Sequence, residues 1–191
     1  MLISDMKVRL NNARRFILDD MEISKIQKFH SIVSYDGVKP STLFPYHSRK
    51  DIGPEFRRLN IEGLVKKYNR EHYVGFIGKD HRSLTKVVRG FTNVMKLIDT
   101  RNDSEAWESE FGKVSYDLGI VLGYPETAIK AYLGELERSK RREPRCMGLI
   151  ACYVRSEQFY DEEMKVALAW KDHVKNNYPE FYSRFSRSCL R

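Results

Sequence analysis

The sequence predicts one mainly helical α+β domain with a small sheet of two or three strands. The chain has 191 residues, about the length of one domain, and 41% of them are hydrophobic, which is enough for a packed core. Most segments repeat apolar residues at the spacing of amphipathic helices. Two segments, 72–77 and 147–154, have the pattern of strands, and so few strands cannot form a doubly wound α/β fold.

The N-terminal region is predicted to form two helices. Residues 6–18 have the apolar periodicity of the first. Asp19 or Asp20 can cap the second, over residues 21–33. Gly37 follows as a helix terminator.

An irregular stretch over 39–53 precedes a helix that begins at Pro54, whose fixed φ suits a first helical turn. This helix is expected to carry the apolar residues Phe56, Leu59, Leu64, Val65 and Tyr68. The segment 72–77 is aromatic and β-branched and is bounded by Gly78, as expected of a strand.

The middle of the chain is predicted to be helical. Residues 83–98 have strongly separated apolar and basic faces, which is typical of an amphipathic surface helix. Asp103 or Ser104 can start the next helix, which ends at Gly123. Another helix begins at Pro125.

The C-terminal region is predicted to contain a strand and a helix. The continuous apolar run MGLIACYV over 147–154 indicates a buried strand. An amphipathic helix is expected over 159–176, and residues 178–191 are expected to fray. Residues 1–191 are therefore interpreted as one globular domain.

The cysteines favour a reducing compartment. Cys146, Cys152 and Cys189 are an odd number without a CxxC pair, and no disulfide scaffold is expected at this chain length. The histidines do not cluster near them, so neither a metal site nor a cofactor is predicted. No apolar run approaches the length of a membrane helix. Asp5 and Lys7 interrupt the stretch that a signal peptide would need, so we expect a cytoplasmic protein.

The net charge of +8 is unevenly distributed along the chain. Residues 39–96 hold 13 basic and 5 acidic side chains, and residues 138–145 hold 5 and 1. Between them, residues 101–137 hold 3 basic and 8 acidic side chains. Basic regions of this kind attract anionic ligands or acidic partners, although charge runs are also typical of solvated helix faces.

The segment 118–133, LGIVLGYPETAIKAYL, has the pattern of a helix-turn-helix. Gly119 permits a close crossing of two helices, and Gly123 suits a left-handed turn. However, residues 115–137 carry one lysine and four carboxylates, and such a surface repels a phosphate backbone. The pattern therefore favours a structural helical corner over a DNA-reading motif.

Two other segments are candidates for binding an anion. Around Gly78, backbone amides could hold a phosphate or carboxylate together with Lys79 and Arg82, although the glycine spacing is not that of a Walker loop. The long loop 37–51 is polar, and its candidate ligand-binding residues are Lys39, Ser41, His47 and Arg49. Ser48 beside His47 does not by itself indicate a catalytic pair.

The segments GVKPSTLF (37–44) and LGIVLGYP (118–125) resemble the motifs Gly-x-Lys-Pro-x-x-Leu-Phe and Leu-Gly-x-x-Leu-Gly-Tyr-Pro of an uncharacterised bacterial family of unknown function. Their order and spacing agree over about residues 30–180. The sequence departs from the family at Tyr116 and Asp117, where the motif has His-Glu. The resemblance implies a bacterial cytosolic protein, and it brings no catalytic residues.

Three hypotheses for function follow. The first is a non-catalytic domain that binds an anionic small molecule or an acidic partner through residues 39–96 and 138–145. The partner contacts in the second segment would be Arg138, Lys140, Arg141, Arg142 and Arg145. The alternatives are an enzyme that acts on a small acidic metabolite at the 37–51 loop, and a nucleic-acid-binding protein that uses the 118–133 corner. The oligomeric state is left open.

Overall fold

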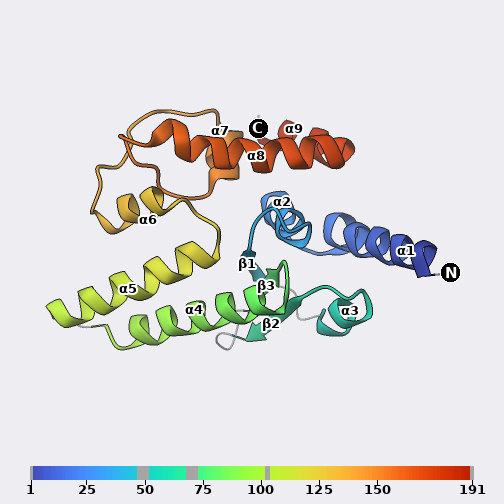
Figure 1. Cartoon of the computed structure of the whole chain (residues 1–191), viewed down its shortest axis with the longest axis horizontal. Helices are drawn as coiled ribbons and strands as arrows, with labels where there is room; N and C mark the ends of the chain where they lie inside the picture. The colour runs from blue at the N-terminus through green and yellow to red at the C-terminus, as the bar shows by residue number, and fades with distance from the viewer. Residues whose placement is uncertain (1, 47–51, 68–72, 102–103, 190–191) are drawn as a thin grey trace.

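The computed structural model describes residues 2–46, 52–67, 73–101 and 104–189 (Figure 1). It confirms a mainly helical α+β fold with one small antiparallel sheet. Within these residues, no helix is long and apolar enough to cross a membrane. The elements in chain order are α1 (Leu2–Arg15), the π-helical turn η1 (Phe16–Asp20), α2 (Lys25–Tyr35), β1 (Ser41–Tyr46), α3 (Gly53–Arg58), β2 (Gly63–Lys67), β3 (Tyr73–Gly78), α4 (His81–Asp99), α5 (Glu105–Val121), α6 (Glu126–Leu133), α7 (Arg145–Ala151), α8 (Tyr160–Asn177) and α9 (Pro179–Cys189).

The sheet has the strand order β1-β3-β2, and both pairings are antiparallel. Ser41 pairs with Gly78 at one end of the β1–β3 ladder. Neighbouring residues of β3 face opposite sides, as the pleat requires. Ile77 joins the main core with α2, whereas Phe76 packs with Leu84 and Val87 of α4. The sheet therefore lies between helices α2 and α4.

The expected helices of the middle region are confirmed, and side chains cap two of them. The Asp80 carboxylate accepts a hydrogen bond from the Ser83 amide at the start of α4, at 2.7 Å. The Ser104 hydroxyl accepts one from the Trp107 amide at the start of α5. Helix α2 begins later than the sequence predicts, since Ser24 caps it instead of an aspartate. Such caps satisfy backbone amides that have no partner within the helix.

The predicted strand over 147–154 is wrong, because residues 145–151 form helix α7. A short apolar run has no periodicity that separates a buried strand from a buried helical segment. Pro144 sets the N-terminus of α7, and Ile150 and Ala151 are buried. The helix ends at Cys152 in a left-handed conformation, with φ 47°.

The predicted helix from Pro54 to Tyr68 is also wrong beyond its first turns. Helix α3 is followed by Asn60 at φ 55°, and the chain then forms strand β2. Asparagine tolerates this left-handed conformation, so it can end a helix. The stretch predicted to be irregular contains β1, where Pro45 is tolerated because β1 is an edge strand.

The C-terminal segment that the sequence predicts to fray contains helix α9. Phe181 and Phe185 of this helix are buried in the main core. Cys189 is joined to Cys146 of α7 in a disulfide, with their Cα atoms 5.3 Å apart. The two cysteines are 43 residues apart in the sequence. Such a spacing matches no short cysteine motif, so the sequence did not predict this disulfide. The disulfide corrects the expectation that all three cysteines are unpaired thiols.

Candidate functional site

The two motif segments, 37–44 and 118–125, contact each other in the fold. The Ser41 hydroxyl donates a hydrogen bond to the Val121 carbonyl at the end of α5, at 2.7 Å. Gly123 has φ 75°, and a Cβ there would lie 2.6 Å from Cδ of Pro40. Glycine is therefore required at this corner both by conformation and by the close approach of Pro40.

Lys39 is buried at this junction, with 1% of its surface exposed. Its Nζ atom lies 4.8 Å from the ring centroid of Trp170 and 5.3 Å from that of Tyr124. Within the described part of the chain, no carboxylate pairs with this ammonium group and no acceptor forms a hydrogen bond to it. Burial lowers the pKa of Lys39, and an electrostatic interaction with Cys152 opposes this effect in part. The faces of the two aromatic rings therefore lie within cation–π distance of this group.

His30 is a second buried polar group beside Lys39. Its Nε2 atom lies 3.3 Å from the Leu149 carbonyl oxygen, and its ring packs edge-on against Trp170. Burial, and secondly the charge of Lys39, lower the pKa of His30 well below its usual value. The imidazole is therefore neutral near pH 7.

Cys152 lies on the other side of Tyr124. Its Sγ atom is 3.7 Å from the Tyr124 hydroxyl oxygen, to which the thiol donates a hydrogen bond. The residue is exposed and, unlike Cys146 and Cys189, it is not in a disulfide. Burial, and then the neighbouring Cys152, raise the pKa of Tyr124 well above its usual value, so the phenol stays protonated.

An open cavity of about 680 Å³ adjoins this cluster and is lined by Tyr124 and Cys152. Its walls come from α4, α5, α6 and the segment 148–155 and are mostly apolar, with Phe111, Leu118 and Ile129 among them. Figure 1 shows α4 and α5 side by side, with α6 between α5 and the C-terminal helices. The charged residues that line the cavity are Arg138 and Arg155, and no described carboxylate joins them.

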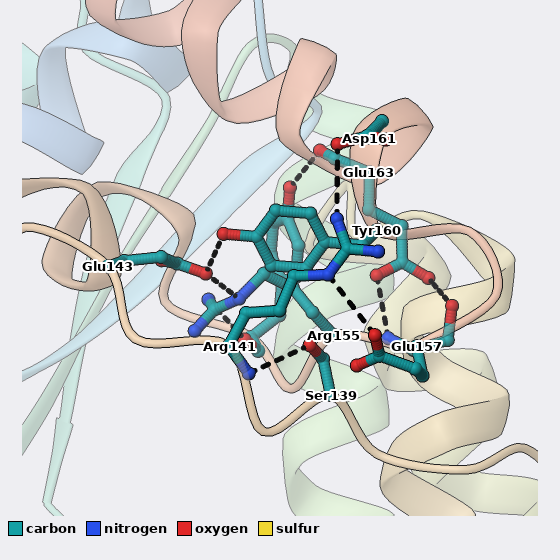
Figure 2. A network of polar contacts seen from close by, with 10 residues as sticks. Ser139, Arg141, Glu143, Arg155, Glu157, Tyr160, Asp161 and Glu163 are labelled. Carbon is teal, nitrogen blue, oxygen red and sulfur yellow. Dashed lines mark hydrogen bonds and ion pairs between the residues drawn. The ribbon is translucent and has the colours of Figure 1, made fainter.

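A polar network holds the segment that carries Cys152 and Arg155 (Figure 2). Arg155 forms an ion pair with the largely buried Glu143. The Tyr160 hydroxyl donates to the same carboxylate at 2.7 Å, and burial, followed by this hydrogen bond, raises the pKa of Tyr160 to about 12. The buried Glu163 accepts hydrogen bonds from the Ser156 amide and hydroxyl, at 2.8 and 2.7 Å. This network orders one wall of the cavity.

The basic run 138–145 is partly engaged inside the protein. Arg138 donates hydrogen bonds to the Ala131 and Tyr132 carbonyls at the end of α6. Arg141 pairs with Glu157 and Asp161 and lies over the Tyr160 ring (Figure 2). The remaining cations of the run are exposed: Lys140, Arg142 and Arg145.

The other predicted ligand-binding residues divide into two groups. Lys39 and Ser41 are buried and face the α5–α6 corner, whereas Lys79 and Arg82 are exposed around the start of α4. The 37–51 loop and the Gly78 turn are adjacent, because the Lys79 amide donates to the Pro40 carbonyl at 3.0 Å. His47 and Arg49 lie outside the residues that the structure describes.

Four residues of the cluster were not identified as site residues from the sequence: His30, Tyr124, Cys152 and Trp170. Tyr124 belongs to the LGYP motif, so the motif itself was the available signal. Cys152 and Trp170 carried none, because their proximity to Tyr124 and Lys39 arises from the packing of α7 and α8.

Comparisons of the chain with models of protein families, with curated proteins and with solved structures found no match. The family resemblance of the two motif segments therefore stays a prediction. The function must be argued from the site itself.

Proposed function

We propose that the protein binds a small anionic molecule with an apolar body in the cavity beside Tyr124 and Cys152. One observation carries this proposal: the cavity is apolar, and its charged lining residues, among those described, are both arginines. An apolar wall favours the body of the ligand by removing it from water, and the arginines favour its anionic end.

The size and composition of the cavity agree with this class of ligand. A volume of about 680 Å³ lies within the usual range of small-molecule sites, which combine apolar walls with a few placed polar groups. Arg155 forms an ion pair with Glu143, but no described carboxylate pairs with Arg138. Arg138 is therefore the group that we expect to favour the anionic end of the ligand.

This proposal narrows the hypothesis of a basic anion-binding surface. Of the residues expected to contact an anion, Arg138 lines the cavity and Lys39 lies behind its Tyr124 wall. Binding of a larger acidic partner by the exposed cations remains a prediction. So do catalysis at the 37–51 loop and nucleic-acid binding at the 118–133 corner.

Two fluorescent probes test the proposal. Anilinonaphthalene sulfonate has an apolar body and one anionic group, whereas phenylnaphthylamine is apolar and neutral. We expect saturable binding of both, with the anionic probe held more tightly. Arg138→Gln should weaken the anionic probe by about tenfold, the usual effect of losing one charge-assisted contact, and leave the neutral probe nearly unchanged.

A cavity-filling variant and a matched control locate the binding site. Ser115 lines the cavity on α5, so Ser115→Phe should weaken both probes. Thr85 is exposed on α4 and does not line the cavity, so Thr85→Phe should change neither. Saturable binding that Ser115→Phe leaves intact would show that the cavity is not the ligand site.

A further inference from the structure

We propose that an exposed basic face on α4 and β2 binds the phosphate backbone of double-stranded DNA. The residues of this basic face are Lys66, Lys67, Arg82, Lys86, Arg89 and Lys96. None of them lines the cavity beside Tyr124, so the inference goes beyond the proposed function and does not depend on it. It rests on the alignment of these cations, on their exposure and on the lack of described carboxylates paired with them.

The four cations of α4 lie on one side of that helix. Arg82, Lys86, Arg89 and Lys96 follow one another at intervals of four, three and seven residues. Such intervals return to nearly the same direction around a helix with 3.6 residues per turn. At a rise of about 1.5 Å per residue, the four cations form a stripe about 21 Å long. All four residues are exposed.

The packing of α4 turns this stripe toward solvent. Helix α5 approaches one flank at Gly90, where an added Cβ would lie 3.2 Å from Cδ1 of Leu118. Strand β2 approaches the other flank, where Lys66 Nζ donates a hydrogen bond to the Thr92 hydroxyl at 3.3 Å. On a helical wheel the stripe lies between these two flanks, opposite the residues that α4 buries. In Figure 1, α4 runs along the lower edge of the molecule, with α5 above it.

The positive charge of the basic face is not neutralised by the described residues around it. Segments 63–67 and 79–99 hold seven lysines and arginines and two aspartates. Asp80 caps α4 through the Ser83 amide, and Asp99 is the last residue of the helix. No ion pair within the described part of the chain includes a cation of the basic face, and this holds for the carboxylates of the neighbouring α5 as well. These cations are therefore available to an external polyanion.

The shape and chemistry of the basic face favour duplex DNA over other polyanions. A row of lysines and arginines suits a row of phosphates, and the major groove of B-form DNA admits an α-helix, whereas that of A-form RNA is too narrow. Proteins that bind single strands usually stack bases on aromatic rings, but segments 63–67 and 79–99 expose no Phe, Tyr or Trp side chain. A membrane-surface helix needs a free apolar face, and most apolar residues of α4 pack against the sheet and α5.

Fluorescence anisotropy of a labelled DNA duplex of about 20 base pairs tests the proposal with the full chain. We expect saturable binding with a Kd of about 1–10 μM at about 50 mM salt, without preference for a base sequence. The logarithm of the association constant should fall with the logarithm of the salt concentration with a slope of about −4, because about four or five phosphates are contacted. Absence of binding, or binding that salt does not weaken, overturns the inference.

Two matched double variants locate the DNA site. Lys86→Gln with Lys96→Gln removes two lysines of the basic face, and Lys165→Gln with Lys175→Gln removes two exposed lysines at the same spacing on α8. The first variant should weaken binding by at least about tenfold and flatten the salt slope by about two, whereas the second should change the affinity by less than about threefold. Equal weakening by the two variants would mean that only the net charge matters, which overturns the assignment to this face.

Competition against the labelled duplex distinguishes DNA from other polyanions. Duplex RNA, single-stranded DNA and phosphatidylserine vesicles are each added at the same phosphate concentration as unlabelled duplex DNA. Weaker competition by all three supports the inference, and equal or stronger competition by any of them overturns it. The cavity probes should bind the Lys86→Gln, Lys96→Gln variant as they bind the wild-type protein, so failure of DNA binding leaves the proposed function intact.

Discussion

The Nζ atom of Lys39 lies 4.8 Å from the ring centroid of Trp170, in the interior between the motif segments and helix α8. A buried ammonium group without a carboxylate is unfavourable, because ring faces replace only part of the water it has lost. Lys39 also lies against the ring of Tyr124, which forms part of the wall of the cavity in which we propose that a ligand binds.

Replacing Lys39 by methionine should stabilise the fold. The variant keeps most of the side-chain volume and removes the uncompensated charge, so we expect the free energy of unfolding at pH 7 to rise by about 1 kcal/mol or more. Urea titration followed by circular dichroism measures this change. A clearly destabilised variant would show that contacts of the ammonium group outweigh its loss of hydration.

The free energies of unfolding of the wild-type protein and of Lys39→Met should depend differently on pH. Because burial lowers the pKa of Lys39 in the folded state, the unfolded chain binds more protons between that pKa and the ordinary lysine pKa near 10.4. Wild-type stability should therefore rise relative to Lys39→Met as the pH increases from 7 toward 10. Urea titrations at several pH values test this, and parallel curves would contradict it.

Cys152 occupies a helix end at which glycine is the favoured residue. Its φ of 47° is strained for a residue with a Cβ atom, so Cys152→Gly should stabilise the protein by about 1 kcal/mol. Cys152→Ala is the control, since alanine keeps the Cβ and should give no such gain. Equal unfolding free energies for the two variants would argue against the left-handed conformation at this position.

Asp36 connects three helices through one buried carboxylate, with 4% of its side chain exposed. It accepts hydrogen bonds from Arg14 at 3.1 Å, His173 at 2.8 Å and Tyr178 at 2.6 Å. Asp36→Asn should lower the free energy of unfolding by about 3 kcal/mol, because the arginine then lacks a partner and one amide must replace two acceptor oxygens.

The control for Asp36 is an ion pair on the surface. Asp19 and Arg184 lie 3.1 Å apart with about half of each side chain exposed. Asp19→Asn should therefore change the free energy of unfolding by less than about 1 kcal/mol. Similar losses in the two variants would mean that burial of the Asp36 network contributes little.

The disulfide between Cys146 and Cys189 attaches helix α9 to α7. A link across 43 residues restricts the unfolded chain, so reduction should lower the free energy of unfolding by about 3–4 kcal/mol. Titration of thiols in denaturant should detect one thiol before reduction and three after it. Three thiols without reductant would show that the two cysteines are not joined.

Helices were predicted from the sequence more successfully than strands. The segments 83–98 and 159–176 have apolar residues at helical spacing over several turns, and local periodicity of that length specifies a helix. Residues 63–67 and 147–151 are short, and the sequence assigned each to the wrong kind of element. Strand β2 exists because it pairs with β3, and that partner is not visible in local spacing.

The candidate site was predicted in part. The sequence alone determined the two motif segments, the tight corner at Gly123 and the uneven charge, because these depend on residue type and nearest neighbours. Only the tertiary structure decided that Lys39 is buried, that Pro40 packs on Gly123, and that Cys152 faces Tyr124. Those contacts join residues far apart in the chain, and long-range packing, which no local pattern encodes, brings them together.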